Sequence, residues 1–268
     1  MKKEEVLAQL KRIRDPEVED IEHLPSRDQV LVCLKEIESL ILPDYFQYQQ
    51  KDADELWFDL ARRLPKEICR ALKIHNDPRD ADELFEAITS KFSKIKQLAL
   101  TDIQAIYDGD PAAKSKQEVI LCYPGFFAIF IYRIAHEFYL LNIPIIPRIM
   151  SEYVHAKTGI DINPGATIGE YFCIDHGTGV VIGETSIIGH HVKLYQGVTI
   201  GAKSFKMDEN GFPVKGGKRH PNIGNNVVIY ANATILGGDT TIEDNCIIGG
   251  NTWITSSVSA GEKVIVND

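Results

Sequence analysis

An aspartate and a histidine stand side by side at Asp175 and His176, within a run of short apolar and glycine-rich units. Another acid, Asp161, precedes them in the chain. A carboxylate that hydrogen-bonds one imidazole nitrogen fixes the tautomer and raises the basicity of the other nitrogen. We therefore interpret His176 as a candidate general base for a hydroxyl or amine nucleophile, with Asp161 as its hydrogen-bond partner. A surface histidine with a casual partner is the alternative.

A second group, Lys218-Arg219-His220, ends a polar and glycine-rich segment of residues 203–220. This segment interrupts the regular units, so we expect it to protrude as a loop. A tolerated insertion is one interpretation, because surface loops accept added residues. We favour an arm that brings Arg219 and His220 to a neighbouring site, because the segment ends in these residues just where the regular units resume.

These candidates must be positioned by a scaffold whose apolar residues repeat every six positions. An α-helix cannot keep such a period on one face, because it has 3.6 residues per turn. A parallel β-helix can, because each six-residue unit forms one flat side and three such sides close one coil. Fourteen aliphatic residues follow this period, in four registers: Ile162, Ile168, Ile174 and Val180; Ile182, Ile188, Leu194 and Ile200; Ile223, Ile229 and Ile235; Ile242, Ile248 and Ile254.

The period also predicts how the coils stack. Each aliphatic side chain should point inward and lie on its counterpart three units later. Asp161 and His176 are separated by slightly less than three units, so they should lie on neighbouring coils near the same corner. One step, from Ile235 to Ile242, is one residue longer than the period and predicts a bulged corner.

The first part of the chain has helical periodicity instead. We predict an α-helical domain over residues 1–155 and a β-helix domain over residues 156–268. Apolar stripes at spacings of three and four run through residues 27–42, 52–64 and 81–100, and we interpret them as helix-packing core. The turns between these helices are expected to carry the prolines Pro16, Pro43, Pro65 and Pro78.

Composition excludes several classes of protein. The chain has 268 residues and a formal net charge of −9, which argues against nucleic acid as a partner. Its five cysteines lack C-x-x-C spacing and fit reduced thiols in the cytoplasm. The most apolar stretch, residues 119–141, is interrupted by Pro124, Arg133 and Glu137, so we expect a buried or partner-facing helix and no membrane span. The start of the chain lacks the apolar segment of a signal peptide.

Metal binding and a covalent enzyme intermediate find little support in the residue pattern. The gamma-class carbonic anhydrases are also built from six-residue coils, but their H-x4-H zinc pair is missing here. His190 and His191 are adjacent, which would point them to opposite faces of a strand. No serine lies in a G-x-S-x-G elbow. We therefore predict no metal site, and direct attack of an activated acceptor on a bound acyl donor.

Several strings resemble the serine O-acetyltransferase family of hexapeptide-repeat acyltransferases, over roughly residues 100–258. The most specific are DHGTGVVIGET (175–185) and KRHPNIG (218–224); DIQAIYDGDPAA (102–113), YPGFFAIFIYRIAH (123–136), DINPGATIG (161–169) and YQGVTIGA (195–202) also match. The resemblance implies a left-handed β-helix. It also implies transfer of the acetyl group of acetyl-CoA to the hydroxyl of L-serine, giving O-acetyl-L-serine for cysteine biosynthesis.

The resemblance further implies a role for each catalytic candidate. His176 would take the proton from the serine hydroxyl, and Asp161 would orient His176. His220 would lie beside the hydroxyl, as a second base or as a positioning group. A backbone N–H would stabilise the oxyanion that forms on the thioester carbonyl.

The substrate contacts implied by the resemblance suit a zwitterion. Asp110 and Asp175 would hold the serine ammonium, and Arg219 would grip its carboxylate with two parallel hydrogen bonds. The alternatives are that Asp110 caps a helix and that Arg219 is a surface charge. The CoA groove would be lined by Gly201, Ala202, Ala231 and Gly250. The family often has Gly-Gly at 201–202 and smaller residues than Tyr230 and Asn232, so this groove is expected to differ in shape.

Assembly and regulation are also implied by the resemblance. The β-helix would form homotrimers with active sites between subunits, and the helical half would pair trimers into hexamers. L-cysteine would inhibit as a serine mimic. The chain ends in VIVND, without the C-terminal Ile that docks into cysteine synthase, so that complex is not expected. Two alternatives are an acetyltransferase for a sugar or another hydroxyl acceptor, and a non-catalytic scaffold of the same fold.

Overall fold

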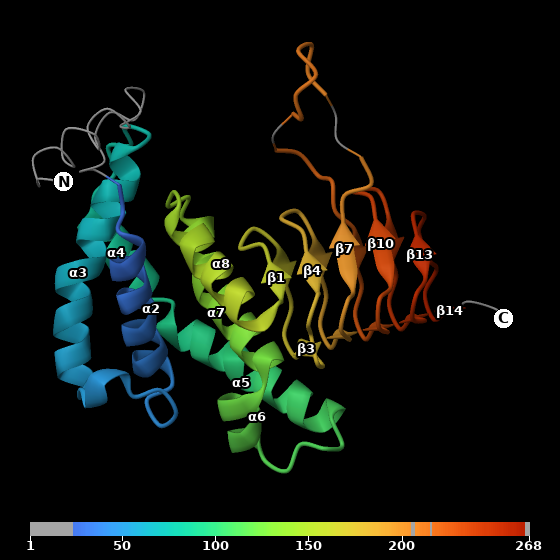
Figure 1. Ribbon diagram of the computed structural model, residues 1–268, viewed down its shortest axis with the longest axis horizontal. Helices are drawn as coiled ribbons and strands as arrows, with labels where there is room; N and C mark the ends of the chain where they lie inside the picture. Colours follow the sequence, from blue (N-terminus) through green and yellow to red (C-terminus); the bar gives the residue numbers. More distant parts are fainter. Residues whose placement is uncertain (1–23, 205–206, 215, 266–268) are drawn as a thin grey trace, which may run out of the picture.

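Three parallel sheets form the second part of the chain (Figure 1). The computed structural model describes residues 24–204, 207–214 and 216–265. The first sheet has the strand order β1-β4-β7-β10-β13, the second β2-β5-β8-β11 and the third β3-β6-β9-β12-β14. Because consecutive strands up to β12 belong to successive sheets, the chain winds as a β-helix. A helical part followed by a left-handed β-helix confirms the predicted fold class.

The strands are short because each one forms a single flat side of a coil. Their bounds are β1 (Asp161–Ile162), β2 (Thr167–Ile168), β3 (Cys173–Ile174), β4 (Val181–Ile182), β5 (Ile187–Ile188), β6 (Lys193–Leu194), β7 (Thr199–Gly201), β8 (Asn222–Ile223), β9 (Val228–Ile229), β10 (Thr234–Leu236), β11 (Thr241–Ile242), β12 (Ile247–Ile248), β13 (Trp253–Ile254) and β14 (Lys263–Val264).

All fourteen aliphatic residues of the predicted registers are buried. Strand pairing stacks them in columns, and Ile182 lies on Ile200, three units later, as predicted. However, the prediction that every stacked pair is separated by three six-residue units is wrong. Ile162 pairs with Ile182, two residues beyond the predicted Val180, because the corner before β4 is longer by that amount. Ile223 pairs with Ile242, where the long step after Ile235 has added one residue to the coil.

The β-helix has three rows of corners, which we number for use below. Corner 1 leads from the first sheet to the second, corner 2 from the second to the third, and corner 3 from the third back to the first. Corner 1 comprises residues 163–166, 183–186, 202–221 and 237–240, and corner 3 comprises residues 175–180, 195–198, 230–233 and 249–252. The described residues of the loop 203–220 leave corner 1 and project from the β-helix, as predicted (Figure 1).

Helices form the described part of the chain before β1, and the last of them ends at Thr158, just past the predicted boundary at residue 155. Side chains of Ser26, Asp52, Asp80 and Ser115 cap four of these helices at their N-termini. The helices are α2 (Arg27–Ile41), the 3-10 turn η2 (Tyr48–Gln50), α3 (Ala53–Lys73), α4 (Ala81–Thr89), α5 (Phe92–Gly109), α6 (Lys116–Cys122), α7 (Pro124–Leu140) and α8 (Ile146–Thr158).

Two helical predictions are wrong. Pro65 was expected in a turn but lies inside α3, because the buried face with Leu60, Leu64 and Ile68 continues past it. The stripe over residues 81–100 is divided between α4 and α5, because Ser90 ends α4 and its hydroxyl bonds the carbonyl of Ala87. Pro16 and the terminal Asp268 lie outside the described residues.

Helix α7 anchors the helical part to the first coil. The guanidinium of Arg133 pairs with the buried carboxylate of Asp102 on α5, and it also donates to the carbonyls of Ile168 and Gly169 in the β-helix. Each of these buried charges would be costly alone, so the two charges must stabilise one another. The contact fixes α5 against the coils, and so it fixes the residues that follow α5.

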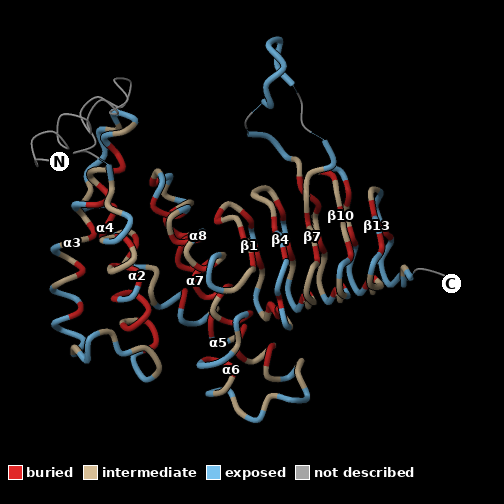
Figure 2. Tube along the Cα trace, viewed as in Figure 1, coloured by how far each residue is buried: buried red, intermediate tan, exposed pale blue. Residues whose placement is uncertain are grey.

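No single helix in the described ranges is long and apolar enough to cross a membrane. Helices α6 and α7 would meet the requirement of length and composition together, but they are bent by 75°. Most of α7 is buried (Figure 2), as expected for residues 119–141.

Candidate active site

Asp175 and His176 lie at corner 3 in the first coil, directly after β3. This corner is two residues longer than the corners stacked on it, and His176 has a left-handed φ of 59°. A non-glycine residue in this region is uncommon and costs conformational energy. The side chain of His176 is 71% exposed, and its Nε2 lies 3.8 Å from the Oδ1 of Asp175, beyond hydrogen-bond distance. The longer corner therefore presents the imidazole outward.

Asp110 reaches the same corner from the end of α5. Its Oδ2 accepts a hydrogen bond from the Tyr123 hydroxyl at 2.6 Å, and its Oδ1 accepts the N–H of Ala112 at 2.8 Å. The bond from Tyr123 holds the pKa of Asp110 below its ordinary value, with smaller contributions from Lys193 and His176. Asp110 is thus an ionised carboxylate beside the candidate base. The helix-cap alternative holds for its backbone, because Asp110 is the C-cap of α5 and its N–H donates to the carbonyl of Ile106, but its side chain also reaches Tyr123.

Asp161 begins β1 beside this corner but does not bond His176. Its backbone N–H donates to Val180, and the carbonyl of Gly159 accepts from Gly179, so the backbones are adjacent as predicted. Among the hydrogen bonds of the described ranges, none joins the Asp161 carboxylate to His176. The predicted hydrogen bond is therefore not formed in this structure, in which the imidazole at the longer corner is exposed, and the orienting role of Asp161 stays a prediction.

The Asp161 carboxylate instead lies near two residues of α8. One ligand atom each from Glu152, His155 and Asp161 falls within 4.8 Å of the others. Sequence reasoning predicted no metal site. Glu152 is exposed and also pairs with Arg148, so we assign no ion to this group.

His220 lies at corner 1 and is 7% exposed. Its Nδ1 accepts the backbone N–H of Thr185 at 3.1 Å and lies 2.9 Å from the Thr185 hydroxyl oxygen. That oxygen accepts the N–H groups of Arg219 and His220, so its own hydrogen is directed to Nδ1. The imidazole proton is therefore on Nε2. Gly183 provides the space, because a Cβ there would lie 2.0 Å from the ring.

Burial, followed by the positive charge of Arg219, lowers the pKa of His220 from its ordinary value of 6.5 to about 4. The ring is therefore neutral at physiological pH, with Nδ1 already used as an acceptor. Of the two roles predicted for His220, a second base and a positioning group, this geometry favours a hydrogen-bond donor through Nε2.

Arg219 is engaged by an acid in the same chain. Its guanidinium pairs with Glu184, which also accepts the Tyr139 hydroxyl at 2.9 Å. The hydrogen bond from Arg219 holds the pKa of Glu184 below its ordinary value. A cavity of about 690 Å³ under the projecting loop includes Arg219, Lys218 and Gly238 in its lining. Arg219 thus faces a concave surface rather than open solvent alone.

The residues predicted to line the CoA groove fall on the same two corners. Gly201 ends β7, and Ala202 is the first residue of corner 1, directly before the loop of residues 203–220. Ala231 and Gly250 stack at corner 3, where the carbonyl of Ala231 accepts the N–H of Asn251 at 2.9 Å. Tyr230 lies beside them, 44% exposed and stacked on Tyr195 with ring centroids 5.1 Å apart.

Each single chain therefore carries the candidate residues in two separate groups, which we call half-sites. Corner 3 brings together Asp110, Asp175 and His176, whereas corner 1 carries Arg219 and His220. The two corners are separated by the width of the first sheet. Sequence reasoning assigned no individual role to Thr185, Glu184 or Lys193. The first two lie within the quoted string 175–185, and only the corner that they occupy identifies them as partners of the second half-site.

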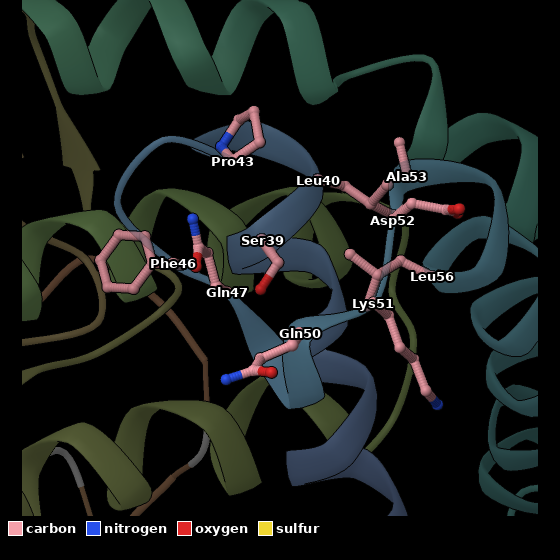
Figure 3. Close-up of a pocket in the computed structure, with 10 residues that line it drawn as sticks. All are labelled: Ser39, Leu40, Pro43, Phe46, Gln47, Gln50, Lys51, Asp52, Ala53 and Leu56. Carbon is pink, nitrogen blue, oxygen red and sulfur yellow. The ribbon is translucent and has the colours of Figure 1, made fainter.

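A pocket in the helical part lies away from both half-sites. It has a volume of about 540 Å³ between α2, η2 and α3, with Ser39, Phe46 and Gln50 in its lining (Figure 3). None of the predicted site residues borders it.

Known proteins match both parts of the chain. The family described as serine acetyltransferase, N-terminal, matches residues 45–130. The plasmid serine acetyltransferase of Synechococcus elongatus is 43% identical over 260 residues, which cover 90% of this chain and 81% of the relative. The chain belongs to the serine acetyltransferase family. Membership confirms the resemblance found in the motifs, and it makes the chain an acyltransferase.

Solved serine acetyltransferases share the fold. Serine acetyltransferase 1 of Entamoeba histolytica, solved in complex with L-cysteine, matches with a TM-score of 0.77 and 38% identity, covering 87% of this chain and 86% of that chain. A serine acetyltransferase in complex with CoA matches with a TM-score of 0.60 and 26% identity, covering 89% and 96%.

Proposed function

We propose that this serine acetyltransferase transfers the acetyl group of acetyl-CoA to the hydroxyl of L-serine, forming O-acetyl-L-serine for cysteine biosynthesis. The observation that carries the proposal is the convergence of two carboxylates and an exposed imidazole at corner 3 of a chain in this family. The two acids suit an acceptor that carries an ammonium group, which a neutral sugar lacks.

In this proposal Asp110 and Asp175 bind the serine ammonium. Each carboxylate has its charge stabilised by a neighbour, Tyr123 for Asp110 and Lys193 for Asp175. Arg219 binds the serine carboxylate with its planar guanidinium. Because Glu184 holds Arg219 in the free chain, serine binding exchanges one carboxylate partner for another.

His176 acts as the general base. Its imidazole takes the proton of the serine hydroxyl while the oxygen attacks the thioester carbonyl of acetyl-CoA. Collapse of the tetrahedral intermediate breaks the carbon–sulfur bond, and the protonated imidazole returns the proton to the CoA thiolate. General base catalysis of this kind contributes about 10²–10⁴-fold. Asp161 remains the proposed orienting group, and this role requires the imidazole to turn from its exposed position toward the coil.

His220 donates a hydrogen bond from Nε2 to the oxygen that becomes negatively charged or to the attacking hydroxyl. Support comes from its two bonds with Thr185, which fix the tautomer, and from its low pKa, which keeps it neutral. A neutral donor that is already oriented needs no rearrangement as charge develops.

The two half-sites combine between subunits in this proposal. Corner 3 of one β-helix would face corner 1 of its neighbour in a homotrimer, which joins His176 with Arg219 and His220. The split of the CoA residues over the same two corners supports this arrangement, because Ala231 and Gly250 would then face Gly201 and Ala202. Pairing of trimers through the helical half, as a hexamer, belongs to the same proposal.

The acceptor site also suggests how the enzyme is regulated, and the state of the cysteines suggests its cell compartment. L-cysteine, which shares the ammonium and carboxylate of serine, would occupy the acceptor site and inhibit; the relative from Entamoeba histolytica was solved with L-cysteine. The five cysteines are all free, which supports the cytoplasm as the compartment. A complex with cysteine synthase is not part of the proposal.

The acceptor is tested by thiol release from acetyl-CoA, followed with a thiol-reactive dye, across a panel of acceptors. We expect release with L-serine and much slower release with homoserine or a simple galactoside. Release with the galactoside alone would retain the fold and overturn the acceptor. Absence of release with every acceptor, together with a CoA-induced thermal shift, would favour the non-catalytic scaffold.

A further inference from the structure

Lys193 lies between the two acids of the corner 3 half-site. It belongs to β6, and its side chain is 16% exposed. The ammonium lies 3.1 Å from Oδ2 of Asp175 and donates to the carbonyl of Gly109 at 2.7 Å. It also lies 4.5 Å from the ring centroid of Tyr195. Burial alone would lower the pKa of Lys193, but hydrogen bonds to Tyr195 and Asp175 raise it overall, so the side chain is charged.

These contacts connect two elements that are far apart in the sequence. Gly109 is the last residue of α5, and Asp110 follows it directly. Asp175 follows β3 in the first coil. One ammonium therefore holds the backbone just before Asp110 and the carboxylate of Asp175. The carbonyl at the end of a helix carries partial negative charge, which strengthens its bond to a cation.

We propose that Lys193 is a positioning residue for the acceptor site, which sets Asp110 and Asp175 at the separation that one ammonium group of serine can bridge. The inference rests on the proposed function, in which these two acids bind that ammonium. Lys193 does not touch the acceptor. It acts through the end of α5 and through Asp175.

Charge alone would have the opposite effect on binding. Two carboxylates and the Lys193 ammonium leave a single net negative charge around the acceptor ammonium. Removing the lysine would increase the attraction of the site for a cation. It would also free the Asp175 oxygen that Lys193 now contacts, so that this oxygen could bind the acceptor ammonium. Weaker serine binding after removal of this charge therefore identifies positioning, because electrostatics by itself predicts tighter binding.

The test compares Lys193→Met with Lys263→Met. Lys263 is a matched control in the same sheet. Lys193 pairs with Val228, Val228 with Ile247, and Ile247 with Lys263, so the two lysines occupy equivalent positions on their strands, but Lys263 is exposed. We expect Lys193→Met to raise the KM for L-serine about tenfold, as for the loss of one good polar contact. The KM for acetyl-CoA should change less than about threefold, and Lys263→Met should match wild type.

Two further variants separate positioning from a general loss of structure. Lys193→Arg keeps a charged donor and should restore the serine KM to within about threefold of wild type. In the background of Asp110→Asn, Lys193→Met should have a smaller effect than in wild type, because the two residues act on one contact. Should Lys193→Met fail to fold, Lys193→Gln serves in the same comparisons.

An unchanged or lowered serine KM in Lys193→Met would overturn the inference, as would equal losses in Lys193→Met and Lys263→Met. Failure of the proposed function gives a different result, since wild type itself would then release no thiol with L-serine.

Discussion

Thr185 holds His220 through two groups, its backbone N–H at 3.1 Å and its hydroxyl at 2.9 Å from the same imidazole nitrogen. The consequence is that only Nε2–H of His220 can face a substrate. A histidine whose basic nitrogen is already occupied acts as a donor and not as a proton acceptor.

Substitution of His220 separates these two roles. His220→Gln can place an amide N–H near the position of Nε2, whereas His220→Ala removes the donor. We expect His220→Ala to lower kcat about 10²-fold, in the range for loss of a donor to a developing oxyanion. His220→Gln should stay within about tenfold of wild type, because one neutral donor replaces another. Equal losses in both variants, measured by thiol release, would instead indicate a base.

The low pKa of His220 also predicts how stability depends on pH. The unfolded chain binds a proton at this residue below pH 6.5, whereas the folded chain does so only near pH 4. The free energy of unfolding therefore falls as the pH drops through this window. Thermal melts of wild type from pH 7 to pH 4 should show a steeper loss of Tm than those of His220→Gln. Parallel curves would show that the imidazole is not held neutral.

Arg219 is expected to recognise the acceptor carboxylate. Arg219→Met should raise the KM for L-serine by about 10²-fold, because a bidentate, charge-assisted pair is lost. The rate with ethanolamine, which has the ammonium and hydroxyl but no carboxylate, should be unchanged. A parallel loss with both acceptors would mean that Arg219 supports structure, for example through its pair with Glu184.

Division of the site between subunits predicts complementation. His176→Asn and Arg219→Met place their changes on different corners, so each variant alone should be nearly inactive with serine. In a mixed trimer, corner 3 of an Arg219→Met subunit can meet corner 1 of a His176→Asn subunit. That interface contains both natural residues, so mixed trimers should recover part of the wild-type activity. Co-expression with two affinity tags isolates the mixed species. Activity no higher than in the separate variants would contradict an active site shared between subunits.

The scaffold was largely predictable from sequence, because a six-residue period allows few structures. Ile182 and Ile200 stack as the period requires. The exceptions have local causes: the long corner at Asp175–Val180 shifts the register by two residues, and Pro65 continues a helix whose packed face outweighs one missing N–H.

The site was predictable only in part. Sequence reasoning selected His176, Asp110 and Arg219 and expected active sites between subunits, but the six-residue period could not assign a corner to residues on either side of the loop. The period also could not show that the Asp161–His176 bond is absent from this structure, since the direction of an imidazole depends on the φ of a single residue. The sequence did not point to Lys193, because its proposed role depends on a contact with Gly109 at the end of α5, which is far away in the chain.

The central claim, that His176 is the general base, is tested most directly by comparing His176→Asn with His191→Asn. Both histidines are exposed corner residues with left-handed φ values of 59° and 55°, which asparagine tolerates, so the two changes are matched in backbone cost. At saturating L-serine and acetyl-CoA, we predict that kcat for thiol release falls about 10²–10⁴-fold in His176→Asn and stays near wild type in His191→Asn. A His176→Asn enzyme with kcat near that of wild type would contradict the assignment of His176 as the base.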